Sequence, residues 1–173
     1  GVDGPADNQF SQPRGICLDN VSKEVFVVDN HNHRVQVFDL RSLAYIRTIA
    51  PKTSTNTSFF AGGRILNSPV GCDLDEKCLY VSDTNNHRIV VFDKTTGEQM
   101  RTISQQGSLL GYLNSPYGIC IDEETDYLYV ADYHNHRIQV FDKESGEFVK
   151  SFASGRVTFA DEDGHEGDQL QQG

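Results

Sequence analysis

The chain has 173 residues, of which 37% are hydrophobic and 23% are charged, and this composition is ordinary for one globular domain. Its net charge of −10 at pH 7 gives no general attraction to nucleic-acid phosphates, because that binding depends on Lys and Arg. No apolar run approaches the ~18–20 residues that a membrane helix needs, and no signal-like leader opens the chain, so we expect a cytoplasmic protein without a membrane span.

One segment occurs three times along the chain. The copies begin at Pro13, Pro69 and Pro116, and their central strings read DNHNHRVQVFD, DTNNHRIVVFD and DYHNHRIQVFD. Near the C-terminus, DGHEGDQLQQ is similar to DGPADNQFSQ near the N-terminus, so residues 163–173 are predicted to lead into a fourth repeat. A repeat of this length predicts a fold in which each copy is one structural unit.

Each copy contains four short runs that are rich in Val, Ile, Tyr and Phe and are separated by turn residues. In the third copy these runs are GICID, YLYVAD, RIQVFD and EFVKSF. Such runs predict strands, and no segment shows a sustained helical period. Four antiparallel strands in each repeat are typical of the blades of a β-propeller. We therefore predict an all-β fold with three four-stranded blades, at residues 13–49, 69–103 and 116–152.

The repeated pattern P-x-G-[IC]-x-[LI]-D, followed by [FY]-V-x-D-x-x-N-H-R-[VI]-x-V-F-D, resembles the NHL repeat. The resemblance extends over essentially the whole chain, residues 1–173. It implies a β-propeller, commonly six-bladed, of which this chain holds half. It also implies a non-catalytic module that binds or scaffolds a protein partner, in some family members beside ubiquitin-ligase domains. Two alternatives follow from the resemblance: an RNA-binding domain, and a zinc-dependent enzyme similar to the peptidyl-amidating lyase.

Asp, His and Arg recur at the predicted turn between the second and third strands of each copy. An Asp at such a corner can accept hydrogen bonds from turn amides, and an Arg can pair with it. The histidines belong to different blades, so they cannot share one metal ion. We predict a structural motif, with no catalytic residue, no metal site and no cofactor. Its members are Asp29, His33, Arg34, Asp83, His87, Arg88, Asp132, His136 and Arg137.

A binding site is expected on one side of the propeller. The strand order places the second-to-third turns and the connections between blades at the same edge, where variable side chains stand on a rigid scaffold. The predicted binding residues are Arg14, Val70, Tyr117, Asn30, His31, Thr84, Asn85, Tyr133 and His134. A protein partner is favoured because exposed Tyr and Arg suit protein interfaces.

Four cysteines are present, and three of them, Cys17, Cys72 and Cys120, lie in apolar runs that predict buried free thiols. A bridge between Cys72 and Cys78 remains possible. The acidic stretch ADEDGHEGD at 160–168 lacks the Gly and Glu spacing of an EF-hand. It is therefore predicted to be a solvated loop.

Three blades form half of a six-bladed ring, so the two end blades would each present an uncovered face. Exposed apolar patches of that size are rare on stable monomers. We therefore expect either further blades from a parent chain or a homodimer in which two copies close one ring.

Overall fold

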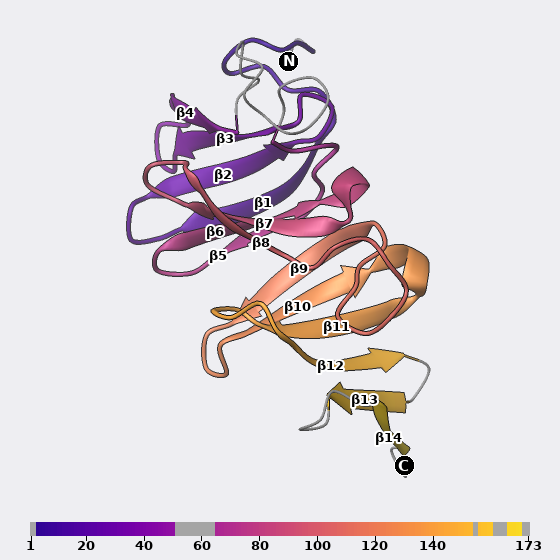
Figure 1. Ribbon diagram of the computed structural model, residues 1–173. Helices are drawn as coiled ribbons and strands as arrows, with labels where there is room; N and C mark the ends of the chain where they lie inside the picture. The colour runs from indigo at the N-terminus through magenta and orange to yellow at the C-terminus, as the bar shows by residue number, and fades with distance from the viewer. Residues whose placement is uncertain (1–2, 51–64, 154–155, 161–165, 171–173) are drawn as a thin grey trace.

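Three antiparallel β-sheets follow one another along the chain and lie side by side in space (Figure 1). The computed structural model describes residues 3–50, 65–153, 156–160 and 166–170. Within each sheet, every strand pairs with its neighbour in sequence. The three sheets are therefore three meanders, which we call the first, second and third blades, and the predicted all-β propeller architecture is confirmed.

The strand bounds follow the three repeats. The first blade contains β1 (Pro13–Asp19), β2 (Glu24–Asp29), β3 (Arg34–Asp39) and β4 (Tyr45–Ile49). The second contains β5 (Cys72–Leu74), β6 (Cys78–Asp83), β7 (Arg88–Asp93) and β8 (Gln99–Ile103). The third contains β9 (Pro116–Asp122), β10 (Tyr127–Asp132), β11 (Arg137–Asp142) and β12 (Phe148–Ala153). Two short 3₁₀ turns, η1 (Thr84–Asn86) and η2 (Tyr133–Asn135), precede β7 and β11.

The third sheet has two strands more than predicted. β13 (Arg156–Ala160) pairs with the outer edge of β12, and β14 (Glu166–Leu170) pairs with β13. The segment predicted to lead into a fourth repeat therefore forms, in its described part, a strand of the third sheet. An unpaired edge of β12 would offer a row of free amides and carbonyls, and β13 pairs with that edge while β14 extends the sheet by one more strand. Residues 161–165 and 171–173 lie outside the described part of the chain.

The hydrophobic core lies between the blades. One cluster joins the first and second blades and includes Phe26, Val37, Leu79 and Phe92. A second cluster joins the second and third blades around Tyr80, Leu128 and Phe141. Both clusters follow from the period of two in the strands, because the strands of the second blade send alternate side chains to the first and to the third blade. Each blade is thus stabilised mainly by the blades beside it.

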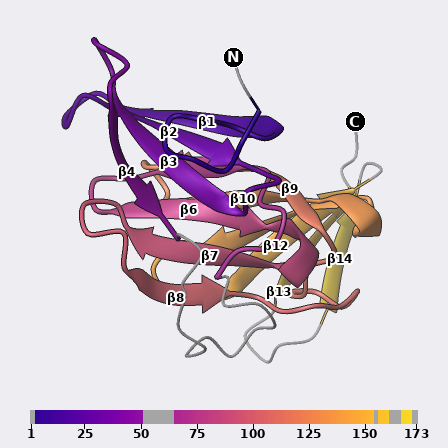
Figure 2. The same cartoon turned by 90° about the horizontal axis from the view of Figure 1, so that it is seen from above.

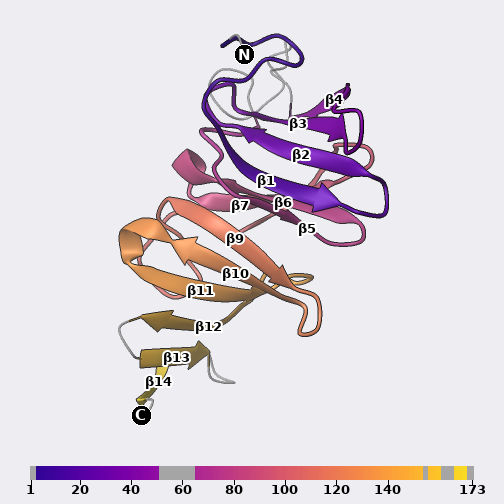
Figure 3. The ribbon, with the colours of Figure 1, turned by 180° about the vertical axis from the view of Figure 1, so that it is seen from behind.

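The inner strands β1, β5 and β9 lie next to one another, as Figure 3 shows from behind. β1 contacts β5, and β5 contacts β9. Figure 2 gives the view after a quarter turn, with the first blade over the second. The first and third blades therefore occupy the two ends of an arc, with the second blade between them.

The cysteines are free in the structure. Cys72 and Cys78 belong to different interblade clusters, because they point to opposite faces of the second blade, and this excludes the bridge between them. Cys17 and Cys72 are buried as predicted. Cys120 is exposed, contrary to the prediction, because within the described part of the chain no blade packs against its side of β9. Among the described residues, no helix has the length and apolarity needed to cross a bilayer.

Candidate binding face

The strand order brings two sets of loops to one side of the molecule. Pro13 at the start of β1 pairs with Asp29 at the end of β2, and Pro116 pairs with Asp132 in the same way. The starts of the inner strands and the turns after β2, β6 and β10 therefore share one edge. We call this side the top face. The turns after β1 and β3, with their equivalents in the other blades, form the opposite, bottom face.

Each of these turns is built around one buried aspartate. Asp132 is fully buried, and its Oδ1 accepts a hydrogen bond from the Asn114 amide at 2.6 Å. Its Oδ2 accepts from Asn135 Nδ2 and Arg137 Nε, both at 2.8 Å. Gln139 Nε2 completes the set at 3.0 Å. Four donors hold this carboxyl group in one orientation, so this site organises the turn.

The other two blades repeat the same arrangement. Asp29 accepts hydrogen bonds from the Ser11 amide, Asn32, Arg34 and Gln36. In the second blade, Asp83 accepts from the Asn67 amide, Asn86 and Arg88, and position 90 is Val in place of the Gln. In all three blades the Asp and Arg form an ion pair at 2.8 Å with a fully buried carboxylate.

The motif arginines also hold the segment that leads into their own blade. Arg34 donates to the carbonyls of Pro5, Ala6 and Gln9. Arg137 donates to the carbonyls of Leu109 and Tyr112. Because each guanidinium is committed to a carboxylate and to backbone carbonyls, it is not displayed to a ligand.

The motif histidines connect neighbouring blades. His33 Nδ1 accepts a hydrogen bond from the Ser68 amide at 2.8 Å, and His87 Nδ1 accepts one from the Ser115 amide at 3.0 Å. His33, His87 and His136 all have left-handed backbones, with φ of 57°, 55° and 53°. The His136 ring is exposed. These residues therefore form an interblade latch wherever another blade follows.

The first top-face position of each turn also contacts the next blade. Asn30 Nδ2 donates to the Pro69 carbonyl at 2.8 Å, and Thr84 Oγ1 donates to the Pro116 carbonyl at 2.7 Å. Asn30 is 4% exposed and Thr84 is 5% exposed. The prediction that they are displayed for binding is therefore wrong, because these side chains are used between blades. Their equivalent in the third blade, Tyr133, is 51% exposed.

The remaining predicted residues lie at the top face with different exposures. Val70 and Tyr117 are partly buried. The exposed residues are Arg14, His31, Asn85, Tyr133 and His134.

Three aromatic rings gather at the top of the third blade. The Tyr117 and Tyr133 rings stack with centroids 4.3 Å apart and planes 9° apart. The His134 ring meets Tyr133 edge to face at 4.9 Å. Since Tyr117 is the second residue of β9 and the other two residues lie in η2, the cluster combines the two loop sets that the strand order brings together. We call these three residues the aromatic cluster.

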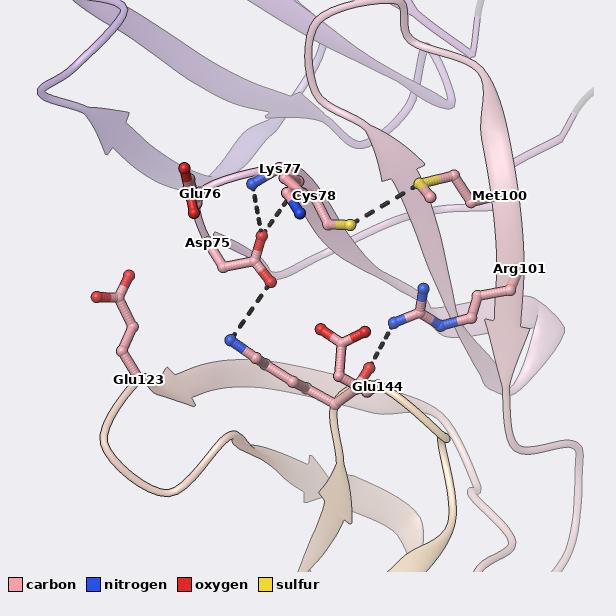
Figure 4. A pocket seen from close by; sticks show the side chains of 9 residues that line it. Asp75, Glu76, Lys77, Cys78, Met100, Arg101, Glu123 and Glu144 are labelled. Atoms are coloured by element: carbon pink, nitrogen blue, oxygen red, sulfur yellow. Dashed lines mark hydrogen bonds and ion pairs between the residues drawn. The ribbon is translucent and has the colours of Figure 1, made fainter.

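A separate hollow lies between the second and third blades at the bottom face (Figure 4). Its volume is about 380 Å³, and seven of its nine lining residues are charged. Asp75 accepts hydrogen bonds from the Lys77 and Cys78 amides, and its carboxylate lies 3.6 Å from Lys143 Nζ. Burial alone would raise the pKa of Asp75, but these partners outweigh it and hold the pKa below the usual range.

The hollow belongs to the joint between two blades. Lys143 reaches Asp75 of the preceding blade, just as Lys94 Nζ reaches Asp19 Oδ2 of the first blade at 2.7 Å. This link was missed in the sequence, although an Asp after each inner strand and a Lys at two of three equivalent turns could have indicated it. In the part of the chain that the structure describes, no group of three or more His, Cys, Asp or Glu is placed to hold a metal ion.

Comparison with known proteins agrees with this geometry. Residues 10–38 match the family model of the NHL repeat, and residues 71–155 match that of a 6-bladed beta-propeller. NHL repeat-containing protein 2 of Gallus gallus is 33% identical over 100 residues, and that of Homo sapiens is 35% identical over 100 residues. These matches cover 55% of this chain but 14% of each relative, so the chain corresponds to a small part of the relatives' length. The repeats, the blades and these matches together identify NHL-type repeats and a β-propeller architecture in this chain.

Proposed function

We propose that this propeller segment is a non-catalytic interaction module that binds a protein partner through its top face. The aromatic cluster carries the proposal. Tyr133 is half exposed, yet its ring is fixed between Tyr117 and His134. Rings that are already ordered lose little conformational entropy on binding, and Tyr is enriched among residues that dominate interface energies.

The chemistry of the motif supports a binding role over a catalytic one. The Asp and Arg of each blade are consumed by the ion pair and by backbone groups. Two of the three motif histidines accept backbone amides from the next blade. These Asp, Arg and His groups are therefore occupied in holding the turns and joining the blades.

RNA is the second candidate, because a stacked Tyr pair can also receive an unpaired base. Arg14 is an exposed cation at the same face. The net charge of −10 opposes this alternative, since binding of nucleic acid draws much of its affinity from cations that neutralise phosphates. The protein partner is therefore the favoured proposal.

The test compares the Tyr117→Ala/Tyr133→Ala variant with Tyr127→Ala. Tyr127 starts β10 at the bottom face of the same blade, so its substitution removes a Tyr side chain that lies outside the aromatic cluster. Proteins captured by the wild-type chain from cells of its source would be identified, purified and titrated against each variant after ribonuclease treatment. We expect the double variant to bind at least about tenfold more weakly, as loss of an interface anchor does.

Tyr127→Ala should retain wild-type affinity, and melting curves must show that all variants are folded. Equal affinities for the double variant and the wild type would refute the proposal. Capture that disappears with ribonuclease and weakens steeply with salt would favour RNA.

A further inference from the structure

We propose that the exposed face of the third blade binds the first blade of a second copy of this chain, so that two copies close one six-bladed ring. This goes beyond the partner-binding role of the top face. The observations come from the two blade junctions within the chain, which define what a junction requires, and from the two end faces. The first and third blades, which carry these faces, lie on either side of the second blade in Figure 1.

Each internal junction brings two inner strands very close together at a glycine. A Cβ on Gly15 would lie 2.6 Å from the Val70 carbonyl oxygen, and one on Gly71 would lie 2.4 Å from that of Tyr117. Gly118 occupies the same position in the third blade, but a Cβ there would meet no atom of the described residues within 4 Å. Gly118 thus has the clearance that a junction needs without a neighbouring strand in this chain.

The latch shows the same pattern. His33 and His87 accept the amides of Ser68 and Ser115, each of which directly precedes the proline of the next blade. His136 has the same left-handed backbone, and its ring is exposed. The residue before the first proline is Gln12, whose φ of 52° matches the 49° of Ser68 and the 54° of Ser115. The first blade therefore presents its amide in the conformation that the latch uses.

The side chains at the two end faces are also complementary. Cys17 and Cys72 share a buried cluster between the first two blades. At the end faces, Cys120 takes the position of Cys17 and is exposed. Ile16 takes the position of Cys72 and is 62% exposed. Leu18 beside Ile16 is 50% exposed, whereas its equivalents Leu74 and Ile121 pack into interblade clusters. Docking the two faces would bury these apolar groups as the internal junctions do.

The outer strands add one more pair. Ile49 and Ile103 are almost fully buried, and each packs against a turn glycine of the next blade, Gly97 or Gly146. Phe152 takes the isoleucine position in the third blade and is 41% exposed. Leu43 takes the glycine position in the first blade and is 66% exposed. Phe152 and Leu43 are larger than the Ile and Gly of the internal junctions. An apolar contact between Phe152 of one copy and Leu43 of the other would take the place of the contact of Ile with Gly.

One internal contact has no counterpart at the proposed junction. Leu40 stands where Lys94 and Lys143 form ion pairs with the preceding blade. The junction between copies is therefore more apolar than the internal ones. Salt should weaken it little, because it lacks an ion pair at this position. Two three-bladed copies related by a two-fold axis would give the six blades of the matching family model, with two identical junctions.

The test uses the full chain in two ways. Sedimentation equilibrium at low micromolar concentration should show a dimer, and Gly118→Ala should weaken the association by about tenfold or more, because the added methyl meets the opposing backbone. The added methyl group contacts none of the described residues of its own copy, so the melting of the dissociated chain should be unchanged. A monomeric wild-type chain, or a Gly118→Ala chain that dimerises normally, would overturn the proposal.

Disulfide trapping tests the orientation. Ile16→Cys should form a disulfide with Cys120 of the other copy under mild oxidation, giving a covalent dimer and no larger species. Val21→Cys is the matched control, since Val21 is 91% exposed but lies in the turn after β1, away from the junction. Adding Cys120→Ser to Ile16→Cys should abolish the product. A ladder of larger species, or equal trapping by the Val21 control, would contradict a closed ring.

Discussion

Replacing His87 should loosen the junction between the second and third blades. Its Nδ1 accepts the amide of Ser115, a residue that is only 8% exposed. Without the ring, this amide loses its partner in a place where water has little access. An unpaired buried amide costs about 1–3 kcal/mol. His87 also has a φ of 55°, which His and Asn tolerate better than Ala.

Two substitutions separate these contributions. His87→Asn removes the long acceptor but keeps a residue suited to the left-handed backbone, and it should lower the free energy of unfolding by about 1–2 kcal/mol. His87→Ala removes both and should cost roughly 1 kcal/mol more. In a domain of this size each kcal/mol lowers Tm by about 2–4 °C. His31→Ala is the control, because His31 is an exposed tip residue of the equivalent turn in the first blade.

The assay combines melting with amide hydrogen exchange at one fixed protein concentration. The Ser115 amide should exchange faster in both His87 variants, while amides in the core of the first blade should keep their relative protection. His31→Ala should lie within about 0.5 kcal/mol of the wild type. An unchanged Tm together with unchanged protection at Ser115 would refute the latch.

Three further changes test the other elements of the fold. Asp83→Ala leaves the Arg88 guanidinium without its buried carboxylate and should cost about 3–5 kcal/mol in urea unfolding; a loss below about 1 kcal/mol would show that the ion pair does not organise the turn. Asp19→Asn tests the link between the first two blades. Burial alone would raise the pKa of Asp19, but its hydrogen bonds with Lys94, Ser22 and the Val21 amide outweigh this effect and hold the pKa well below the usual range. The ionised form therefore stabilises the fold above about pH 4, and this contribution should fade as the pH drops toward the lower native value. Stability measured against pH should show a shallower acid limb for Asp19→Asn, and an identical limb would count against the link. Gly71→Ala should cost about 1–3 kcal/mol, because its methyl group would meet a backbone carbonyl of the third blade, and a wild-type Tm would contradict this close approach.

Most of the fold could be predicted from the repeats in the sequence. Three copies with turns in step predict three meanders, and the strands of the first two blades follow that pattern. The contribution of Asp29 to its turn could also be expected, since its Arg and Asn partners lie within five residues. Such local contacts depend on spacing that the sequence displays directly.

The burial of individual top-face residues could not be predicted in the same way. Asn30, Thr84 and Tyr133 occupy one position of the repeat, but two of them contact a following blade and the third does not. Cys120 differs from Cys17 for the same reason. Exposure at these positions depends on what stands next to the blade, and this information lies outside the repeat itself. The pairing of β13 with the edge of β12, and of β14 with β13, likewise depends on a free strand edge that the sequence of the tail does not indicate.

The blade junctions also allow surface side chains to vary without loss of the contacts that hold the blades together. At each one, the receiving blade contributes mainly backbone atoms: the Ser68 amide and the Pro69 and Val70 carbonyls at the first, and their counterparts at the second. A backbone amide or carbonyl is retained whatever side chain accompanies it. The variable position between proline and glycine, Arg14, Val70 or Tyr117, can therefore change without losing the bonds that hold its blade. Natural variation or a designed library can alter the surface chemistry at these positions while the spacing between blades stays constant.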